Sequence, residues 1–200
     1  MSLDERSSLG GPTLGHAAVM DNAAEVQETC DECGFDANDW TRDRITKELG
    51  TAADAWREVF GRHEADTLHA RPRPEVWSAV EYAVHTARVV EFWGDACRTV
   101  TSGGVVDIDM ASYPDADVFP YNEVAPDEAL ADLATHFASL HGLTETASTE
   151  EWAAPLRISH PEIEQAFHAM GIADAGTGAL HAVHDALHHL GDVERGLLPA

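Results

Sequence analysis

Residues 71–93, "RPRPEVWSAVEYAVHTARVVEFW", hold the pattern that decides the fold. After the prolines, apolar side chains return every three or four positions, which is the period of a helix with one buried face. We expect this helix to run from about Pro74 to Thr101, where a glycine pair ends it. Its apolar side consists of Val76, Trp77, Val80, Val84, Ala87, Val90 and Trp93. His85 lies beside this stripe, so its ring is expected to point into the protein.

Three further long helices are predicted from patterns of the same kind. They run from about Asp39 to Gly61, from Pro126 to beyond Leu140, and from about Thr177 to Glu194, with a short helix at 161–170. Four long helices and few convincing strands indicate an all-α four-helix bundle. Residues 102–124 have no period and predict one of several long inter-helix loops.

Two regions of different character divide the chain. Residues 1–38 are expected to form a mobile tail and a turn segment with a CxxC motif, an irregular N-terminal extension. Residues 39–200 are expected to form the bundle domain. Two hundred residues are sufficient for one domain with its own hydrophobic core.

The charge of the chain excludes several classes of partner. Thirty-six acidic residues against 12 Lys and Arg give a formal net charge of −24. A surface this negative repels nucleic acids and anionic membranes, so we expect a small-molecule substrate, with a homodimer as an option. No apolar run reaches the roughly 18 residues of a membrane span, and the N-terminus lacks the pattern of a signal peptide. Three cysteines suit a reducing compartment, and a cytoplasmic acidic protein is therefore expected.

Histidines are concentrated at residues 181–196, "HAVHDALHHLGDVERG". Side chains four positions apart share one helical face, so His184 and His188 could bind one metal ion together. Asp185 and His189 form a second such pair, turned by about 100° from the first. His85 is the best third ligand from another helix. Three histidines would leave a coordination position open, as in catalytic zinc sites, and imidazole also suits nickel, iron or copper.

Plainer interpretations of these residues remain open. An HxxxH spacing arises by chance in a histidine-rich helix, and a single histidine such as His85 is often only a core residue. Cys30 and Cys33, in "CDECG", have the form of a zinc knuckle, but they could also be a redox pair or have no role. Two more ligands would be needed for zinc, and Cys97, His63 and His69 are the candidates.

Four stretches resemble the DinB/YfiT-like superfamily. Residues 71–93 are similar to its first signature, and "HDALHHLGDV" (184–193) is similar to its second. "CDECGFD" (30–36) and "DADVFPYNE" (115–123) resemble segments of an actinobacterial branch of metalloproteins within this superfamily.

The resemblance implies a four-helix bundle that holds one divalent metal, zinc first, through His85, His184 and His188. Many relatives end the second motif with histidine, any residue, glycine and glutamine, whereas this chain has "HHLGD". An alignment on that glycine makes Asp185 and His189 the ligand pair instead. The ungapped match favours His184 and His188.

The function expected on this basis is a metal-dependent enzyme that activates a low-molecular-weight thiol, such as mycothiol, or water. The reaction would be that of a thiol-dependent S-transferase or isomerase, or of a hydrolase. Glu81 and Asp192 are expected to orient the ligand imidazoles, and Arg157 is a candidate substrate contact. The alternative is a non-catalytic metal-binding or stress-response bundle protein.

Overall fold

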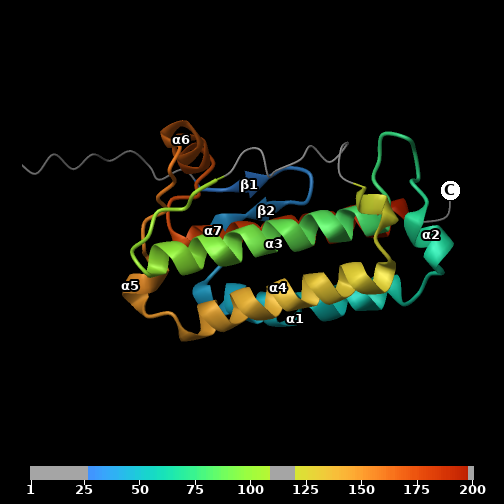
Figure 1. The fold of residues 1–200 in the computed structure, drawn as a ribbon, viewed down its shortest axis with the longest axis horizontal. Helices are drawn as coiled ribbons and strands as arrows, with labels where there is room; N and C mark the ends of the chain where they lie inside the picture. The colour runs from blue at the N-terminus through green and yellow to red at the C-terminus, as the bar shows by residue number, and fades with distance from the viewer. Residues whose placement is uncertain (1–26, 109–119, 198–200) are drawn as a thin grey trace, which may run out of the picture.

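The computed structural model describes residues 27–108 and 120–197 and places four long helices side by side. They are α1 (Arg42–Phe60), α3 (Ala79–Thr101), α4 (Pro126–Thr146) and α7 (Ala175–Gly196). α3 packs against α4 and α7, and α1 packs against the same two helices. In Figure 1, α3 and α7 form one layer and α1 and α4 the other. The all-α bundle predicted from the sequence is confirmed.

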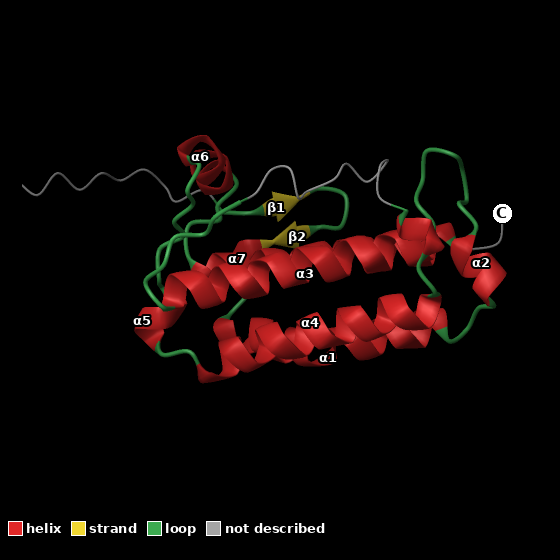
Figure 2. Cartoon of the chain, viewed as in Figure 1, coloured by secondary structure: helices red, strands yellow, loops and turns green. Residues whose placement is uncertain are grey.

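Short elements join and flank the long helices (Figure 2). They are the helices α2 (Ala65–His69), α5 (Thr149–Trp152) and α6 (Pro161–Ala169), the 3-10 helices η1 (Ala37–Asp39) and η2 (Tyr121–Glu123), and the strands β1 (Thr29–Cys30) and β2 (Phe35–Asp36). The sequence predicts α6 but not α2 or α5, which are too short to show a period. Most of the expected N-terminal tail (1–26) and part of the long loop (109–119) lie outside the described residues.

α3 begins at Ala79, five residues later than the sequence pattern suggests, because Ser78 and Glu81 cap it. The backbone N–H of Glu81 donates to Ser78 Oγ at 3.2 Å, and the backbone N–H of Ser78 donates to the Glu81 carboxylate at 2.8 Å. This reciprocal capping box satisfies two backbone donors at the helix end. The residues before Ser78 form a turn, in which Val76 N–H donates to the Arg73 carbonyl.

The core lies between the two helical layers. Apolar side chains from all four long helices are buried there, and Ile172 adds to them from the segment before α7. The largest fully buried side chains include Leu49, Trp56, Val80, Val90, Leu133, Phe137, Leu140 and Val183. Their spacing along each helix is the three-and-four period of the sequence, which explains why the helices could be predicted.

Gly178 allows α7 to approach α3 closely. A Cβ atom at this position would lie 2.7 Å from Cε3 of Trp93, which is too close for an ordinary contact. The Trp93 ring also contacts the ring of His181, one turn further along α7, at a centroid distance of 5.5 Å. Because α3 and α7 run in opposite directions, this packing brings the second half of α7 alongside the first half of α3.

A two-stranded antiparallel hairpin lies on the outer side of the α3–α7 layer (Figure 1). Thr29 pairs with Asp36 and Cys30 pairs with Phe35. The ring of Phe35 is buried and stacks on the ring of His184 of α7, with centroids 4.1 Å apart. The segment with the CxxC motif is therefore packed against the bundle.

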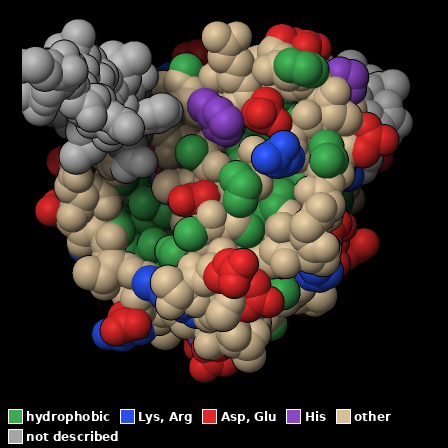
Figure 3. Space-filling model, turned by 90° about the vertical axis from the view of Figure 1, so that its left-hand side faces the viewer, with side chains coloured by type: hydrophobic (Ala, Val, Ile, Leu, Met, Phe, Trp, Pro, Cys, Tyr) green, Lys and Arg blue, Asp and Glu red, His purple; other side chains and the backbone are tan. Residues whose placement is uncertain are grey.

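Acidic side chains are spread over the end of the bundle that carries α5 and α6, with a few basic side chains between them (Figure 3). Their dispersion fits the formal net charge of −24. Within residues 27–108 and 120–197, no helix has the length and apolar character that crossing a membrane requires.

We predict that Glu81→Gln destabilises the protein at neutral pH. The Glu81 side chain is 6% exposed and binds the guanidinium of Arg71 through both oxygens. Burial raises the pKa of Glu81, but the hydrogen bonds from Arg71 and Ser78 outweigh it and lower the pKa below its ordinary value of 4.5. Losing a hydrogen bond to a charged group costs about 1.5–3 kcal/mol.

The ion pair stabilises the fold above the unfolded-state pKa of about 4.5 and is lost as the pH falls through the lower folded-state pKa. Urea unfolding of both proteins from pH 7 to pH 3 should therefore show their difference in unfolding free energy shrinking toward acid. A difference that stays constant over this range would contradict the assignment.

Candidate metal centres

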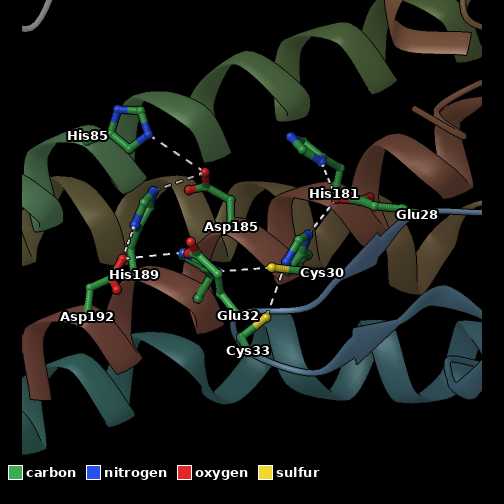
Figure 4. A network of polar contacts seen from close by, with 11 residues as sticks. Glu28, Cys30, Glu32, Cys33, His85, His181, Asp185, His189 and Asp192 are labelled. Atoms are coloured by element: carbon green, nitrogen blue, oxygen red, sulfur yellow. Dashed lines mark hydrogen bonds and ion pairs between the residues drawn. The ribbon is translucent and has the colours of Figure 1, made fainter. Parts of the chain in front are cut away.

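α7 presents side chains that could bind a metal ion on two adjacent faces (Figure 4). Asp185 and His189 face α3, where they meet His85. His184 and His188 face the hairpin, where they meet Cys30 and Cys33. The two faces differ by about 100° because successive residues of a helix are rotated by that angle.

His85, Asp185 and His189 form the first centre. Asp185 Oδ2 lies 3.7 Å from His85 Nε2 and 3.5 Å from His189 Nε2. These values are near the separation of about 3.4 Å that nitrogen and oxygen ligands have around a tetrahedral zinc ion. Exposed side-chain fractions are 29%, 14% and 18% for His85, Asp185 and His189. The centre is thus shielded, and its most accessible side is at His85.

Asp185 gives an independent sign that a cation fits here. Its Oδ1 atom is buried and has no hydrogen-bond partner in the described part of the chain. A buried carboxylate oxygen without a partner is costly, and a bound cation would offset that cost. The donor set of two imidazoles and one carboxylate suits a divalent metal.

Asp192 orients the ring of His189. His189 Nδ1 lies 3.0 Å from Asp192 Oδ2, so the N–H at Nδ1 donates to this carboxylate. The lone pair of His189 Nε2 is then directed at Asp185 and His85. A carboxylate behind a ligating histidine fixes the ring and makes it a better metal ligand.

Aromatic rings surround the first centre. Trp77 lies 5.2 Å from His85, and Tyr82 lies 5.1 Å from His189, both measured between ring centroids. Trp77 also contacts Tyr121 of η2. Burial is the main reason that the pKa of Tyr82 is raised. These rings give the centre a partly apolar wall.

Cys30, Cys33, His184 and His188 form the second centre. Cys30 Sγ lies 3.6 Å from His188 Nδ1, and Cys33 Sγ lies 3.4 Å from His184 Nε2. One ligand atom from each of the four residues lies within 4.8 Å of all the others. The set His85, His184 and His188 expected from the sequence is therefore divided between two centres. Rotation along α7 separates His85 from the other two.

Glu28 contacts His184 of the second centre, together with His181. Its Oε1 atom lies 2.7 Å from His181 Nδ1 and 2.5 Å from His184 Nδ1. Burial raises the pKa of Glu28, but the hydrogen bonds from the two histidines outweigh it and lower the pKa to about 2. Sequence reasoning missed this residue, because the irregular segment that holds it shows no pattern pointing to α7.

The backbone around the CxxC motif stabilises a thiolate. Hydrogen bonding from the Cys33 N–H is the main reason that the pKa of Cys30 falls to about 6, against the opposing effect of burial. Burial raises the pKa of Cys33. Gly34 has a φ of 72°, a left-handed conformation that glycine adopts without strain and that allows the turn to close.

Two other residues singled out in the sequence lie away from the ligand atoms. The Glu81 carboxylate binds Arg71 and caps α3, as described above. The Arg157 carbonyl accepts from the N–H of Val106, which follows the C-terminal end of α3. His85 lies near the other end of α3, about 24 Å along the helix from Thr101. The backbone of Arg157 therefore lies far from the first centre.

We predict that Asp192→Asn weakens metal binding at the first centre by about 10–100-fold, the usual effect of losing a carboxylate behind a ligating histidine. The measurement is competition with a coloured chelator. Asp95→Asn is the matched control, because Asp95 is an exposed acid of α3 that pairs with the surface residue Arg98. Equal affinities in the two variants would rule out the orienting role.

Comparison with known proteins assigns a family to the chain. The family model described as DinB superfamily matches residues 48–196. The matched part contains all three residues of the first centre, whereas Cys30 and Cys33 precede it. No curated protein and no solved structure matches the chain. Because the family model covers most of the sequence, the protein belongs to the DinB superfamily.

Proposed function

We propose that the protein is a metal-dependent enzyme whose ion is held by His85, Asp185 and His189. The observation that carries this proposal is the Asp185 carboxylate: its Oδ2 lies near two imidazoles from different helices, and its Oδ1 is buried without a hydrogen-bond partner among the described residues. The DinB superfamily is metal-binding in general, and the three residues lie inside the matched range.

The ligand count favours catalysis over a purely structural ion. Three protein ligands are typical of catalytic sites, because they leave a coordination position for a substrate, whereas structural zinc sites are closed by four. A divalent ion held there would supply Lewis acidity and lower the pKa of a thiol or a water molecule.

The surrounding residues have distinct roles in this proposal. Asp192 holds the His189 ring in one orientation, so that this ligand needs no rearrangement during a reaction. Trp77 and Tyr82 exclude part of the solvent and offer apolar surface to a substrate. The 29% exposure of His85 leaves a way in from solvent on that side.

The substrate class that we propose is a low-molecular-weight thiol together with an electrophile, with mycothiol as one candidate thiol. One carboxylate among the three ligands leaves a divalent ion with a net positive charge, which favours an anionic thiolate at the remaining position. The acidic surface argues against nucleic acid as a substrate. Water as the activated group, and hence hydrolysis, is the second candidate.

We predict that Asp185→Asn and His189→Ala each remove one metal ion per chain without unfolding the bundle. Metal content is measured by elemental analysis, and folding by circular dichroism. His168→Ala, at an exposed position of α6, is the control for loss of a histidine and should keep its full metal content. Full occupancy in both ligand variants would eliminate this centre.

Activity is tested on the metal-loaded protein with mycothiol, bacillithiol and glutathione, each offered with a panel of electrophiles. Thiol adducts are followed by mass spectrometry. We expect adduct formation with the unchanged protein and only background formation with Asp185→Asn. A protein that binds its ion at these residues but forms no adduct and hydrolyses no ester would instead be the non-catalytic metal-binding bundle.

A further inference from the structure

We propose that Cys30, Cys33, His184 and His188 bind a second ion, a structural zinc that fastens the N-terminal hairpin to α7. This centre is independent of the proposed enzyme activity. It would join two parts of the chain that lie more than 150 positions apart, with sequence separations of 158 for Cys30–His188 and 151 for Cys33–His184.

The distances fit tetrahedral zinc. With bonds of about 2.3 Å to sulfur and about 2.0–2.1 Å to nitrogen, a tetrahedral ion holds each sulfur about 3.5 Å from each nitrogen. The two observed separations are 3.4 Å for Cys33 and His184 and 3.6 Å for Cys30 and His188. Two thiolates and two imidazoles in tetrahedral arrangement are a donor set typical of zinc.

Carboxylates fix the orientation of both imidazoles. His184 Nδ1 donates to Glu28, which leaves Nε2 free to face Cys33. His188 uses the opposite nitrogen: Nδ1 faces Cys30, while Nε2 lies 3.5 Å from the carboxylates of Glu32 and Asp192. Each ring is thus held with one nitrogen toward sulfur and the other toward an acid, which is the arrangement around metal-bound histidines.

The backbone turn between the two cysteines is closed by a hydrogen bond. The Gly34 N–H closes the turn on the Cys30 carbonyl at 2.9 Å. All four coordination positions come from the protein, so the site is closed in the way of structural zinc.

The small size of the hairpin supports a structural role for the ion. The hairpin has two residues in each strand, and a hairpin of that size is marginal in water without further support. Its main apolar anchor is Phe35, which stacks on His184, one of the four ligands. An ion that binds the folded protein better than the unfolded chain stabilises the hairpin and its contact with α7.

The first test is zinc content after purification under reducing conditions. Cys33→Ser and His188→Ala should each lower the content by one zinc ion per chain. Cys97→Ser is the matched control, because Cys97 is a cysteine buried in α3 that is outside the centre, and it should keep the full content. Having two ligand variants guards against one of them failing to fold.

Cobalt distinguishes this centre from the one on α3. Cobalt bound by two thiolates gives an intense sulfur-to-metal charge-transfer band in the near ultraviolet, which a site without sulfur lacks. The band should appear in the unchanged protein and in Asp185→Asn and disappear in Cys33→Ser. A chelator should also expose residues 27–41 to limited proteolysis in the unchanged protein.

The experiments can overturn either proposed metal site without the other. Equal zinc content in the unchanged protein, Cys33→Ser and His188→Ala, with no sulfur band from cobalt, would overturn the proposed zinc site whatever Asp185→Asn shows. A Cys30–Cys33 disulfide that persists after reduction and zinc addition would overturn it as well, in favour of a redox pair. Loss of metal in Asp185→Asn alone would leave only the first centre.

Discussion

The arrangement depends on one geometric constraint, the rotation of about 100° between successive residues of α7. This rotation turns Asp185 and His189 toward α3, and His184 and His188 toward the hairpin. A single helical segment can therefore offer a ligand pair to each of two neighbours. The close approach of α7 to α3 at Gly178 brings the first pair within reach of His85. The stacking of Phe35 on His184 positions the hairpin against the second pair.

Asp192 connects the two faces. Its Oδ2 atom lies 3.0 Å from His189 Nδ1 and 3.5 Å from His188 Nε2, while Oδ1 binds Arg195. One carboxylate thus faces a ring nitrogen of a candidate ligand in each centre. Arg195 compensates its charge and limits its rotation. Because both rings face the same carboxylate, we expect a substitution that displaces it to change the orientation of a candidate ligand in both centres.

The long helices could be predicted from the sequence, because each buries an apolar face whose residues recur with a helical spacing. The sequence also indicated His85 and the two candidate pairs on α7, but it favoured His184 and His188 as the partners of His85, whereas the packing brings Asp185 and His189 to it. Both pairs have ligand spacing, and only the packing of α3 and of the hairpin decides which pair meets which partner. In the family motif, a glycine follows the last ligand histidine by two positions. Gly191 therefore favoured His189, and with it Asp185, as the ligand pair. Glu28 had no such sign, because it reaches His184 only through tertiary structure.

Charge distinguishes the two centres chemically. Two thiolates would neutralise a divalent ion bound by Cys30, Cys33, His184 and His188, so the proposed zinc site would be closed and neutral. The single carboxylate of Asp185 would leave a divalent ion beside His85 and His189 with a net positive charge, within a protein whose formal net charge is −24. Under the proposed function, the bound ion would attract a small thiolate, whereas the acidic surface repels a large polyanion such as a nucleic acid.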